Sequence, residues 1–388
     1  MIKTYNSIVY LCLMALVLGF LGGYSMNSEA KDYSYTIDGG SPNRYPAIYD
    51  FNGNYFTDNK GGVLLPFVPR GSAMYWGNGT QATLASERNP MPYGIKVRWF
   101  SVAENIFWEG SHTFDQQILR GLTHYKTDDI LYRKQKNFID SMSFTVYVTP
   151  GGFVTVWVSG AGENILLAQF YAKKMQQEPE WKKFYHDSIS KLSEAEPRDE
   201  FVKETLKNHQ TYIDNELNGK AEFFNDTQVE GKPLTAAPWL RLMKTYDWYL
   251  SVNDQYFTLR DYRVYYVNAE SRFIYSGDNQ LVKARPVPSL LNFFFQNKQN
   301  KNTPERINIE FDVDEIMQAF AELSLTPPLD KPINLYMEIK PDLSDLKAYA
   351  IKGDKKILLK KASPELVDLY DGGYDVDIPW PEQTKNWR

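Results

Sequence analysis

The chain has 388 residues, of which 43% are hydrophobic and 23% are charged, and its formal net charge is -5. This composition is typical of a globular protein and excludes a collagen-like or broadly disordered chain, and the length favours two domains over one. The acidic balance argues against nucleic acid as a partner, because binding to phosphates needs an excess of lysine and arginine.

Residues 1–30 have the pattern of a signal peptide. Lys3 precedes an apolar run over residues 8–21, which two glycines end. The run is short for a membrane-spanning helix, and the small residues before Lys31 suit cleavage there. We therefore expect a periplasmic protein made of residues 31–388. The alternative is an uncleaved segment, which would be the chain's only contact with the membrane and would anchor it there.

The single cysteine, Cys12, lies inside this apolar run. A cleaved chain would therefore contain no cysteine and form no disulfide, even in an oxidising compartment. Thiol catalysis and zinc sites with cysteine ligands are excluded for the same reason.

The sequence from residue 31 to residue 175 predicts mainly strands. Residues 31–92 are rich in Gly, Asn, Pro and Tyr, which predicts loops and short strands. The elements predicted after them, from the spacing of apolar residues, are a strand over 94–101, a helix over 113–122 capped by Ser111 or Thr113, a hairpin over 143–158 that turns at 150–152, and a helix over 163–175.

The second half begins with a charged stretch and then returns to strands. Residues 176–230 predict solvated helices or an inserted helical arm, with helical stretches at about 181–193 and 199–218. The elements predicted after residue 233 are strands over 246–252 and 256–267, a linker or mobile loop over 285–304, a strand over 307–312, a helix over 313–323, a strand over 333–339, and a strand over 346–359 that contains a turn at Gly353.

The order strand, helix, strand, strand occupies residues 95–158 and recurs over residues 307–359. We therefore predict a β-rich α+β fold of two topologically similar modules, each made of antiparallel strands with packed helices. The N-terminal α+β module would span residues 31–232 and carry the charged arm at about 176–230. The C-terminal α+β module would span residues 233–388. The alternative is that both halves merely use a common arrangement of elements.

The sequence contains no recognisable catalytic or metal-binding pattern. It has neither G-x-S-x-G nor H-E-x-x-H, and its four histidines are scattered. Gly160-Ala161-Gly162 lacks the third glycine of a phosphate-binding loop, which favours a plain turn. The acidic segment 370–377 has no distal glutamate at the spacing of a calcium loop, which favours a solvated tail.

Glu104 and Glu109 flank the aromatic pair Phe107-Trp108. Paired carboxylates can act as acid and base when their environments differ, but nothing else marks a substrate site. A structural role at the end of a strand or the start of a helix is therefore favoured. We expect that the protein is not an enzyme and that it uses no cofactor and no metal.

The segment 91–110 has a distinctive pattern, in which the strand residue Trp99 is followed by Ser101, Glu104 and the pair Phe107-Trp108. With the hairpin at 151–157 and the predicted helix that carries Gln169-Phe170, it resembles a family of uncharacterised Gram-negative envelope lipoproteins. The resemblance covers roughly residues 60–180. It departs from the family at Tyr24, where members usually carry the lipidated cysteine.

Members of that family are often encoded beside type VI secretion effectors, especially lipases of the α/β-hydrolase class, and are thought to act as their periplasmic immunity proteins. The resemblance therefore implies a protein that binds and inhibits a secreted antibacterial effector, with a phospholipase as the first candidate. The alternatives are a structural or ligand-binding module of the cell envelope without a toxin partner, and an enzyme of unrecognised type that would lose activity in Glu104→Gln.

Interfaces concentrate their binding energy in Trp, Tyr and Arg side chains. The candidate partner-binding residues are Phe67, Arg70, Tyr75 and Trp76 in the loop over 66–76, together with Trp99, Glu104 and Trp108 of the distinctive segment. The alternative for the loop is that it packs on its own domain.

Overall fold

The computed structural model describes residues 32–42, 45–68, 80–84, 88–123, 141–160, 163–216, 234–275, 284–298 and 304–367. The expected signal peptide, the loop residues 69–79 and the acidic tail after residue 367 lie outside these ranges. Within the described ranges, no helix combines the length and the apolar character that crossing a membrane requires.

Strands dominate the described chain, which confirms the prediction of a β-rich α+β fold. The prediction of antiparallel strands needs correction at two places, because residues 34–40 run parallel to 141–147 and residues 248–252 run parallel to 333–337. The strands of the first half are β1 (Ser34–Gly40), β2 (Ala47–Tyr49), β3 (Tyr55–Thr57), β4 (Val63–Pro66), β5 (Thr80–Leu84), β6 (Gly94–Ser101), β7 (Ile106–Thr113), β8 (Ser141–Thr149), β9 (Phe153–Gly160), β10 (Glu163–Tyr171) and β11 (Lys173–Lys174). Those of the second half are β12 (Thr245–Val252), β13 (Phe257–Tyr266), β14 (Ser271–Tyr275), β15 (Ala284–Pro286), β16 (Pro288–Asn297), β17 (Pro304–Glu310), β18 (Ile333–Ile339), β19 (Leu346–Lys352), β20 (Lys355–Leu358) and β21 (Ser363–Val367).

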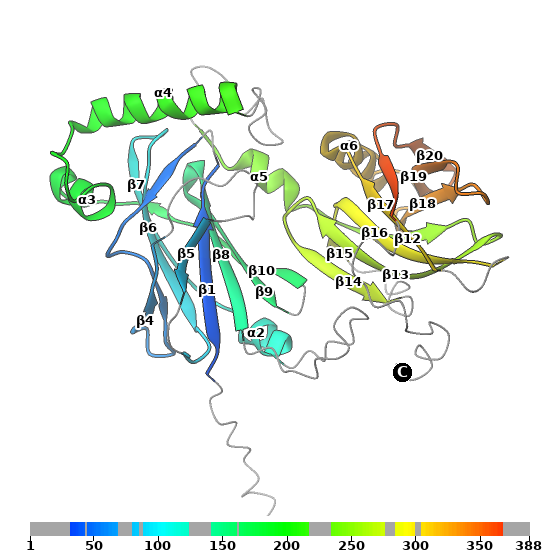
Figure 1. The fold of residues 1–388 in the computed structure, drawn as a ribbon, viewed down its shortest axis with the longest axis horizontal. Coiled ribbons are helices and arrows are strands. Elements are labelled where there is room, and N and C mark those ends of the chain that lie inside the picture. The colour runs from blue at the N-terminus through cyan, green and yellow to red at the C-terminus, as the bar shows by residue number, and fades with distance from the viewer. Residues whose placement is uncertain are drawn as a thin grey trace, which may run out of the picture.

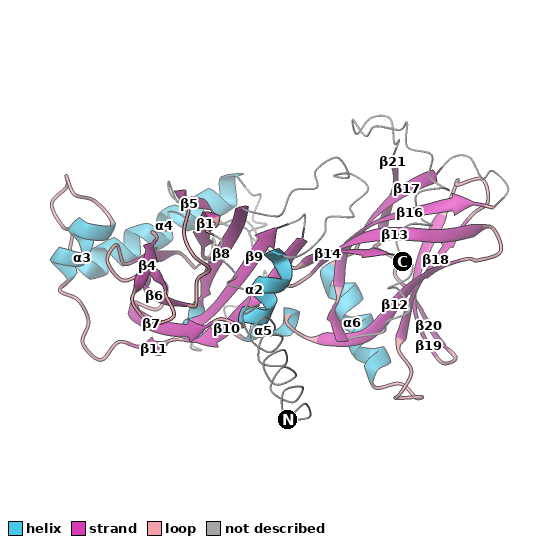
Figure 2. Cartoon of the chain, turned by 90° about the horizontal axis from the view of Figure 1, so that it is seen from below, coloured by secondary structure: helices cyan, strands magenta, loops and turns pink. Residues whose placement is uncertain are grey.

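The helices lie around the sheets, and the longest of those described spans residues 198–216 (Figure 1). They are α2 (Gln116–Thr123), α3 (Trp181–Ser188), α4 (Arg198–Glu216), α5 (Ala237–Leu242), α6 (Val313–Ser324) and the 3-10 turn η1 (Pro150–Gly152). Figure 2 shows α3 and α4 at the end of the molecule that lies away from α6.

The largest sheet runs through both halves of the chain. Its ten strands follow the order β21-β17-β16-β13-β14-β10-β9-β8-β1-β5 (Figure 1). The two halves meet where β10 pairs with β14 at Asn164 and Ser271. Side chains add to this short ladder, because Asn164 Nδ2 donates to Ala269 O at 2.7 Å and Leu166 N donates to Glu270 Oε1 at 3.1 Å.

The first core lies between two layers of strands. One layer is the sheet β11-β7-β6-β3-β4, in which β2 also pairs with β6, and the other consists of β1, β8, β9 and β10. Alternate residues of β6, namely Ile95, Val97 and Trp99, point into this core. The predicted strand over 94–101 is therefore confirmed, with Lys96 and Arg98 on its outward face.

Strand β9 is buried on both faces and so connects the two cores. Val154, Val156 and Val158 pack in the first core, whereas Phe153 and Trp157 pack with residues of the second half. The indole nitrogen of Trp157 donates to Asn268 O at 3.0 Å, in a wholly buried position. The predicted hairpin over 143–158 is confirmed as β8, η1 and β9.

The second core lies between the sheet β15-β12-β18-β19-β20, helix α6 and the second-half strands of the large sheet. Helix α6 buries Ile316, Phe320 and Leu323, and it begins after Asp312, whose carboxylate accepts a hydrogen bond from Glu315 N at 2.9 Å. The predicted helix over 313–323 and the turn at Gly353 between β19 and β20 are both confirmed.

The predicted helix over 163–175 is wrong, because this segment forms β10 and β11. Its apolar residues fit a helical spacing, but a short apolar run does not distinguish a helix from a strand. Pairing with β9 decides the outcome: β10 runs antiparallel to β9 from Glu163 to Tyr171, with an irregularity between Leu166 and Ala168.

Two further predictions need correction. The cap of α2 is Asp115, whose carboxylate accepts from Gln117 N at 2.8 Å, since Ser111 and Thr113 belong to β7. The expected linker over 285–304 contains β15, β16 and the start of β17. Its prolines and amides suggested a loop, but Leu291, Phe293 and Phe295 alternate into the second core.

The described part of the charged stretch contains the two predicted helical stretches, α3 over 181–188 and α4 over 198–216, with non-helical segments at 176–180 and 189–197. The aromatic cluster of Phe100, Phe107, Trp181, Phe184 and Phe201 packs α3 and α4 against β6 and β7. These helices are therefore attached to the outer face of the first sheet by an apolar contact.

Candidate partner-binding face

Three residues of the distinctive segment, Trp99, Glu104 and Trp108, form one linked structural group. Trp99 and Trp108 are paired across β6 and β7, and their rings stack with centroids 6.3 Å apart. The indole nitrogen of Trp108 donates to Glu104 Oε2 at 3.1 Å, and Gly151 N donates to Glu104 Oε1 at 3.0 Å. Glu104 thereby ties the β6–β7 turn to the β8–β9 turn.

The glycine at position 152 is required by both backbone conformation and space. Gly152 has a φ of +73°, and a Cβ atom placed there would lie 2.7 Å from the ring of Trp108. The ring can therefore lie on the β8–β9 turn only because residue 152 has no side chain.

Glu104 and Glu109 have different partners, so the structure does not bring them together as an acid and base pair. Both oxygens of Glu104 accept hydrogen bonds inside the structural group described above. Glu109 instead forms ion pairs with Lys96 at 3.1 Å and with Arg98 at 3.1 Å. The structural interpretation of Glu104 agrees with this geometry.

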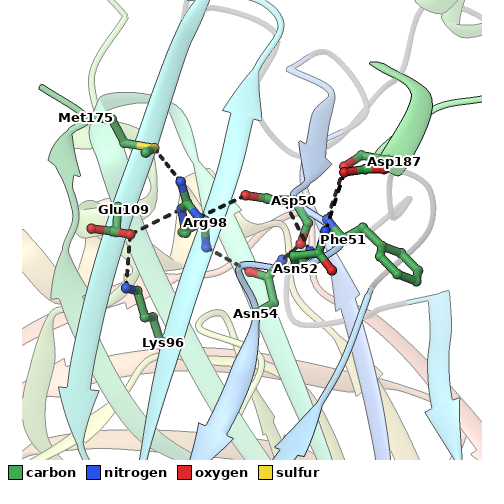
Figure 3. A network of polar contacts seen from close by, with 10 residues as sticks. Asp50, Phe51, Asn52, Asn54, Lys96, Arg98, Glu109, Met175 and Asp187 are labelled. Atoms are coloured by element: carbon green, nitrogen blue, oxygen red, sulfur yellow. Dashed lines mark hydrogen bonds and ion pairs between the residues drawn. The ribbon is translucent and has the colours of Figure 1, made fainter. Parts of the chain in front are cut away.

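A charged network lies on the outward face of the same sheet (Figure 3). Arg98 is its centre: Nε lies 3.1 Å from Glu109 Oε2, Nη1 lies 3.2 Å from Asp50 Oδ2, and Nη2 lies 3.7 Å from Met175 Sδ. Glu109 Oε2 also forms an ion pair with Lys96, so the Glu109 carboxylate is paired with two cations. The Arg98 side chain keeps 25% of its surface exposed, which leaves it within reach of a partner.

The local backbone holds Arg98 in place. Arg98 N donates to Asn54 Oδ1 at 2.8 Å, and Asn54 Nδ2 donates to Asp50 O at 2.5 Å. A Cβ atom on Gly53 would lie 2.5 Å from Cδ of Arg98, so the glycine provides the space that the side chain occupies. The arginine is thus positioned by strands and a tight turn.

The network forms part of a depression of about 800 Å³, which we call the charged depression. Its lining comes from β6, β7, β11, the end of β10 and the segment after β11: Lys96, Arg98, Glu109, Gly110, Ser111, Tyr171, Lys173, Lys174, Met175, Gln176 and Gln177. Tyr171 is 57% exposed, and Lys173 and Lys174 are also exposed.

Arg198 at the start of α4 fixes the neighbouring β6–β7 turn. Its guanidinium lies 5.0 Å from the ring centroid of Phe100 and 5.1 Å from that of Phe107. It also donates to Asn105 Oδ1 at 2.6 Å and forms an ion pair with Glu178 at 2.7 Å. The ion pair with Glu178 thereby attaches α4 to the segment that follows β11, directly after the lining residue Gln177.

Most of the predicted partner-binding residues are not on a described surface. Phe67 and Trp99 are each 1% exposed and pack in the first core, with Phe67 5.3 Å from Phe56 between ring centroids. They cannot contact a partner in this fold, so these two predictions are wrong. Trp108 and Glu104 are half-buried, and neither lines the charged depression. The remaining three predicted residues, Arg70, Tyr75 and Trp76, lie outside the described residues.

Sequence reasoning missed the residues that form the charged depression. Lys96 and Arg98 were recognised only as the polar side of a strand, although that pattern places both on one outward face. Lys173, Lys174 and Tyr171 were concealed by the incorrect helix over 163–175. The correct strand pairing would have placed Lys173 opposite Glu109.

The histidines in the described part of the chain do not gather. His112 in β7 stacks on Phe170 with centroids 5.2 Å apart, and burial lowers its pKa. Across the described ranges, no group of three or more His, Cys, Asp or Glu side chains is arranged to hold a metal ion.

The residues that match a known protein family include this face. Residues 24–216 match the model of a family described as protein of unknown function (DUF2931). The match spans β1 to β11, α3 and α4, so the whole charged depression lies inside the DUF2931 region. The expectation of an uncharacterised domain family is confirmed to this extent. No curated protein and no solved structure matches the chain.

Proposed function

We propose that this protein is an exported periplasmic binding protein that inhibits a secreted antibacterial effector, with a phospholipase as the first candidate. In this proposal it acts by occluding the effector and not by catalysis. The observation that carries the proposal is the charged depression, an outward-facing recognition surface built on paired strands.

Two properties of the charged depression support binding to a protein. Its central arginine is held by Asp50 and Glu109, so little conformational freedom remains to be lost on association. Tyr171 stands exposed at the rim, and Tyr and Arg are the side chains that interfaces use most often as anchors. The type VI secretion and immunity parts of the proposal rest on the resemblance of residues 60–180.

The second candidate is a ligand-binding module of the cell envelope without a toxin partner. The observation in its favour is that a volume of about 800 Å³ falls in the range of small-molecule sites. The lining is predominantly polar and charged, whereas most small-molecule pockets are apolar, and this favours the protein partner.

We also propose that the chain consists of two modules of one topology, residues 31–232 and 233–388. The support comes from matching strand pairings. In the first module β1 runs parallel to β8, and β8, β9 and β10 are antiparallel to one another in turn. In the second module β12 runs parallel to β18, and β18, β19 and β20 are antiparallel in the same way. The antiparallel sets β6-β7-β11 and β16-β17-β21 also correspond, and α2 and α6 hold the same place in chain order.

The test of function is the activity of the effector encoded by the neighbouring gene, titrated with purified residues 31–388. The proposal predicts that phospholipase activity disappears at about one equivalent and that the two proteins elute together from gel filtration. Full activity at a tenfold excess, without a complex, would exclude the effector proposal and leave the envelope module as the better account.

A further inference from the structure

We infer that the charged depression binds an acidic segment of the protein partner, whose carboxylates are received by Arg98, Lys173 and Lys174. This inference rests on the proposed partner-binding function and adds the chemistry of the partner. Three properties of the molecule support it: the charge of the depression, the hydrogen-bonding capacity of Arg98 and the strand register.

The charge of the depression is opposite to that of the chain. Lys96, Arg98, Lys173 and Lys174 line it, whereas Glu109 is its single acidic lining residue and Asp50 contacts Arg98 from the side. The chain as a whole carries a formal charge of -5. A local excess of cations on an acidic protein attracts acidic partners and increases their rate of association.

Arg98 has donor capacity that its present partners do not use well. A guanidinium has five N–H donors, and its Nη2 faces the thioether sulfur of Met175 at 3.7 Å. Sulfur is a weak acceptor, so a carboxylate oxygen that enters the depression would form a stronger, charge-assisted hydrogen bond there. The ion pairs with Asp50 and Glu109 would meanwhile keep the side chain in its present orientation.

The strand register places a second cation in the same row. Lys173 is paired with Glu109, and Glu109 is paired with Arg98, so the three residues lie side by side on β11, β7 and β6. Residues paired directly across neighbouring strands share one face of the sheet. An extended acidic segment that crosses these strands would meet Arg98 and Lys173 in succession.

The rest of the lining favours a polypeptide over an isolated anion. Ser111, Gln176 and Gln177 provide hydroxyl and amide groups that can pair with a peptide backbone, and Tyr171 is 57% exposed beside them. A tyrosine ring offers contact area to side chains at low entropic cost. We therefore assign an acidic peptide segment and not a lipid headgroup to this surface.

The first test uses a fluorescein-labelled peptide of ten alternating Glu and Gly residues, titrated with residues 31–388 and followed by anisotropy. The test variant is Lys173→Glu/Lys174→Glu. The matched control is Lys244→Glu/Lys331→Glu, which makes the same charge change at two exposed lysines of the second half. We expect binding to be at least about tenfold weaker in the test variant and unchanged in the control, with a marked loss for all proteins at high salt.

Two results of this titration would overturn the inference. The first is no binding of the peptide, or equal binding by the test and control variants. The second is binding to phosphatidylglycerol vesicles that depends on Lys173 and Lys174 when the peptide does not bind, which would assign the depression to an anionic lipid.

A second arm separates this inference from the proposed function. The test and control variants are each titrated against the effector as described above. Inhibition that is equal in both variants would keep the effector proposal and overturn the acidic segment. Peptide binding that depends on the two lysines, with no inhibition of the effector by the unmodified protein, would support the acidic segment and overturn the effector proposal.

Discussion

The indole nitrogen of Trp108 in β7 donates to Glu104 Oε2 at 3.1 Å in the turn between β6 and β7. The other carboxylate oxygen of Glu104 accepts from Gly151 N at 3.0 Å, and this second bond connects that turn to the turn between β8 and β9. Glu104→Ala would remove the acceptor of two hydrogen bonds, and we expect it to lower the free energy of unfolding by roughly 1–3 kcal/mol. Glu104→Gln should cost less, because its amide oxygen can still accept from Gly151 N. Urea denaturation measures both variants.

The control for this prediction is Glu204→Ala at an exposed position of α4, where no more than about 0.5 kcal/mol is expected. An unchanged midpoint in Glu104→Ala, accompanied by loss of an activity, would instead favour the enzyme hypothesis for Glu104.

The contact between Gly152 and Trp108 predicts a second effect. Gly152→Ala should destabilise the protein by roughly 2–4 kcal/mol, because it combines an unfavourable positive φ with a clash against the Trp108 ring. Gly61→Ala is the matched control: its φ is +80°, but a Cβ there meets nothing within 4 Å. Only the backbone cost of about 1 kcal/mol should remain in this control. Equal losses in the two variants would contradict the proposed packing of Trp108.

The hydrogen bond from Trp157 to Asn268 links the two halves of the chain, and its loss should lower the stability of the protein. Trp157→Phe would leave the Asn268 carbonyl buried without its donor, and we expect a loss of about 1–3 kcal/mol in thermal or urea unfolding. Trp181→Phe removes an indole bond to Glu196 O in an exposed position and should cost less. A larger effect in Trp181→Phe would argue against a buried link at β9.

Burial raises the pKa of Glu163, which lies where β10 meets β14, and the hydrogen bond from Phe273 N only partly opposes this. Its stabilising contribution should therefore be complete below the unfolded pKa of 4.5 and be lost as pH rises through the raised folded pKa. Glu163→Gln cannot ionise. The melting temperature of this variant minus that of the unmodified protein should increase between pH 4.5 and pH 7.5 in differential scanning fluorimetry. A difference that stays constant over this range would contradict the burial of Glu163.

The sequence predicted correctly those elements in which the spacing of apolar residues agrees with a turn or cap residue at the element's end. The hairpin over 143–158 combines alternating apolar residues with the turn at Pro150-Gly151-Gly152, and α6 combines the cap at Asp312 with an apolar face. In both cases a residue with a specific conformational role marks the boundary of the element.

The remaining elements depend on pairing partners that are distant in sequence. Strand β10 forms because the edge of β9 is available to it, and β16 forms because β13 and β17 lie on either side. The charged depression could not be predicted either, because its lining comes from β6, β7, β11 and the end of β10. The sequence pattern predicted a helix in place of β10 and β11, so their residues could not be placed beside β7. Phe67 and Trp99 were assigned to a surface because residue type alone does not distinguish an interface anchor from a core side chain.

Hydrogen exchange of residues 31–388, measured with and without the effector, is the most direct test of the charged depression as the binding face. If the charged depression binds the effector, exchange slows on complex formation in peptides that cover residues 94–101, 106–113 and 171–177. Protection confined to the second half, with these three segments unchanged, would contradict it.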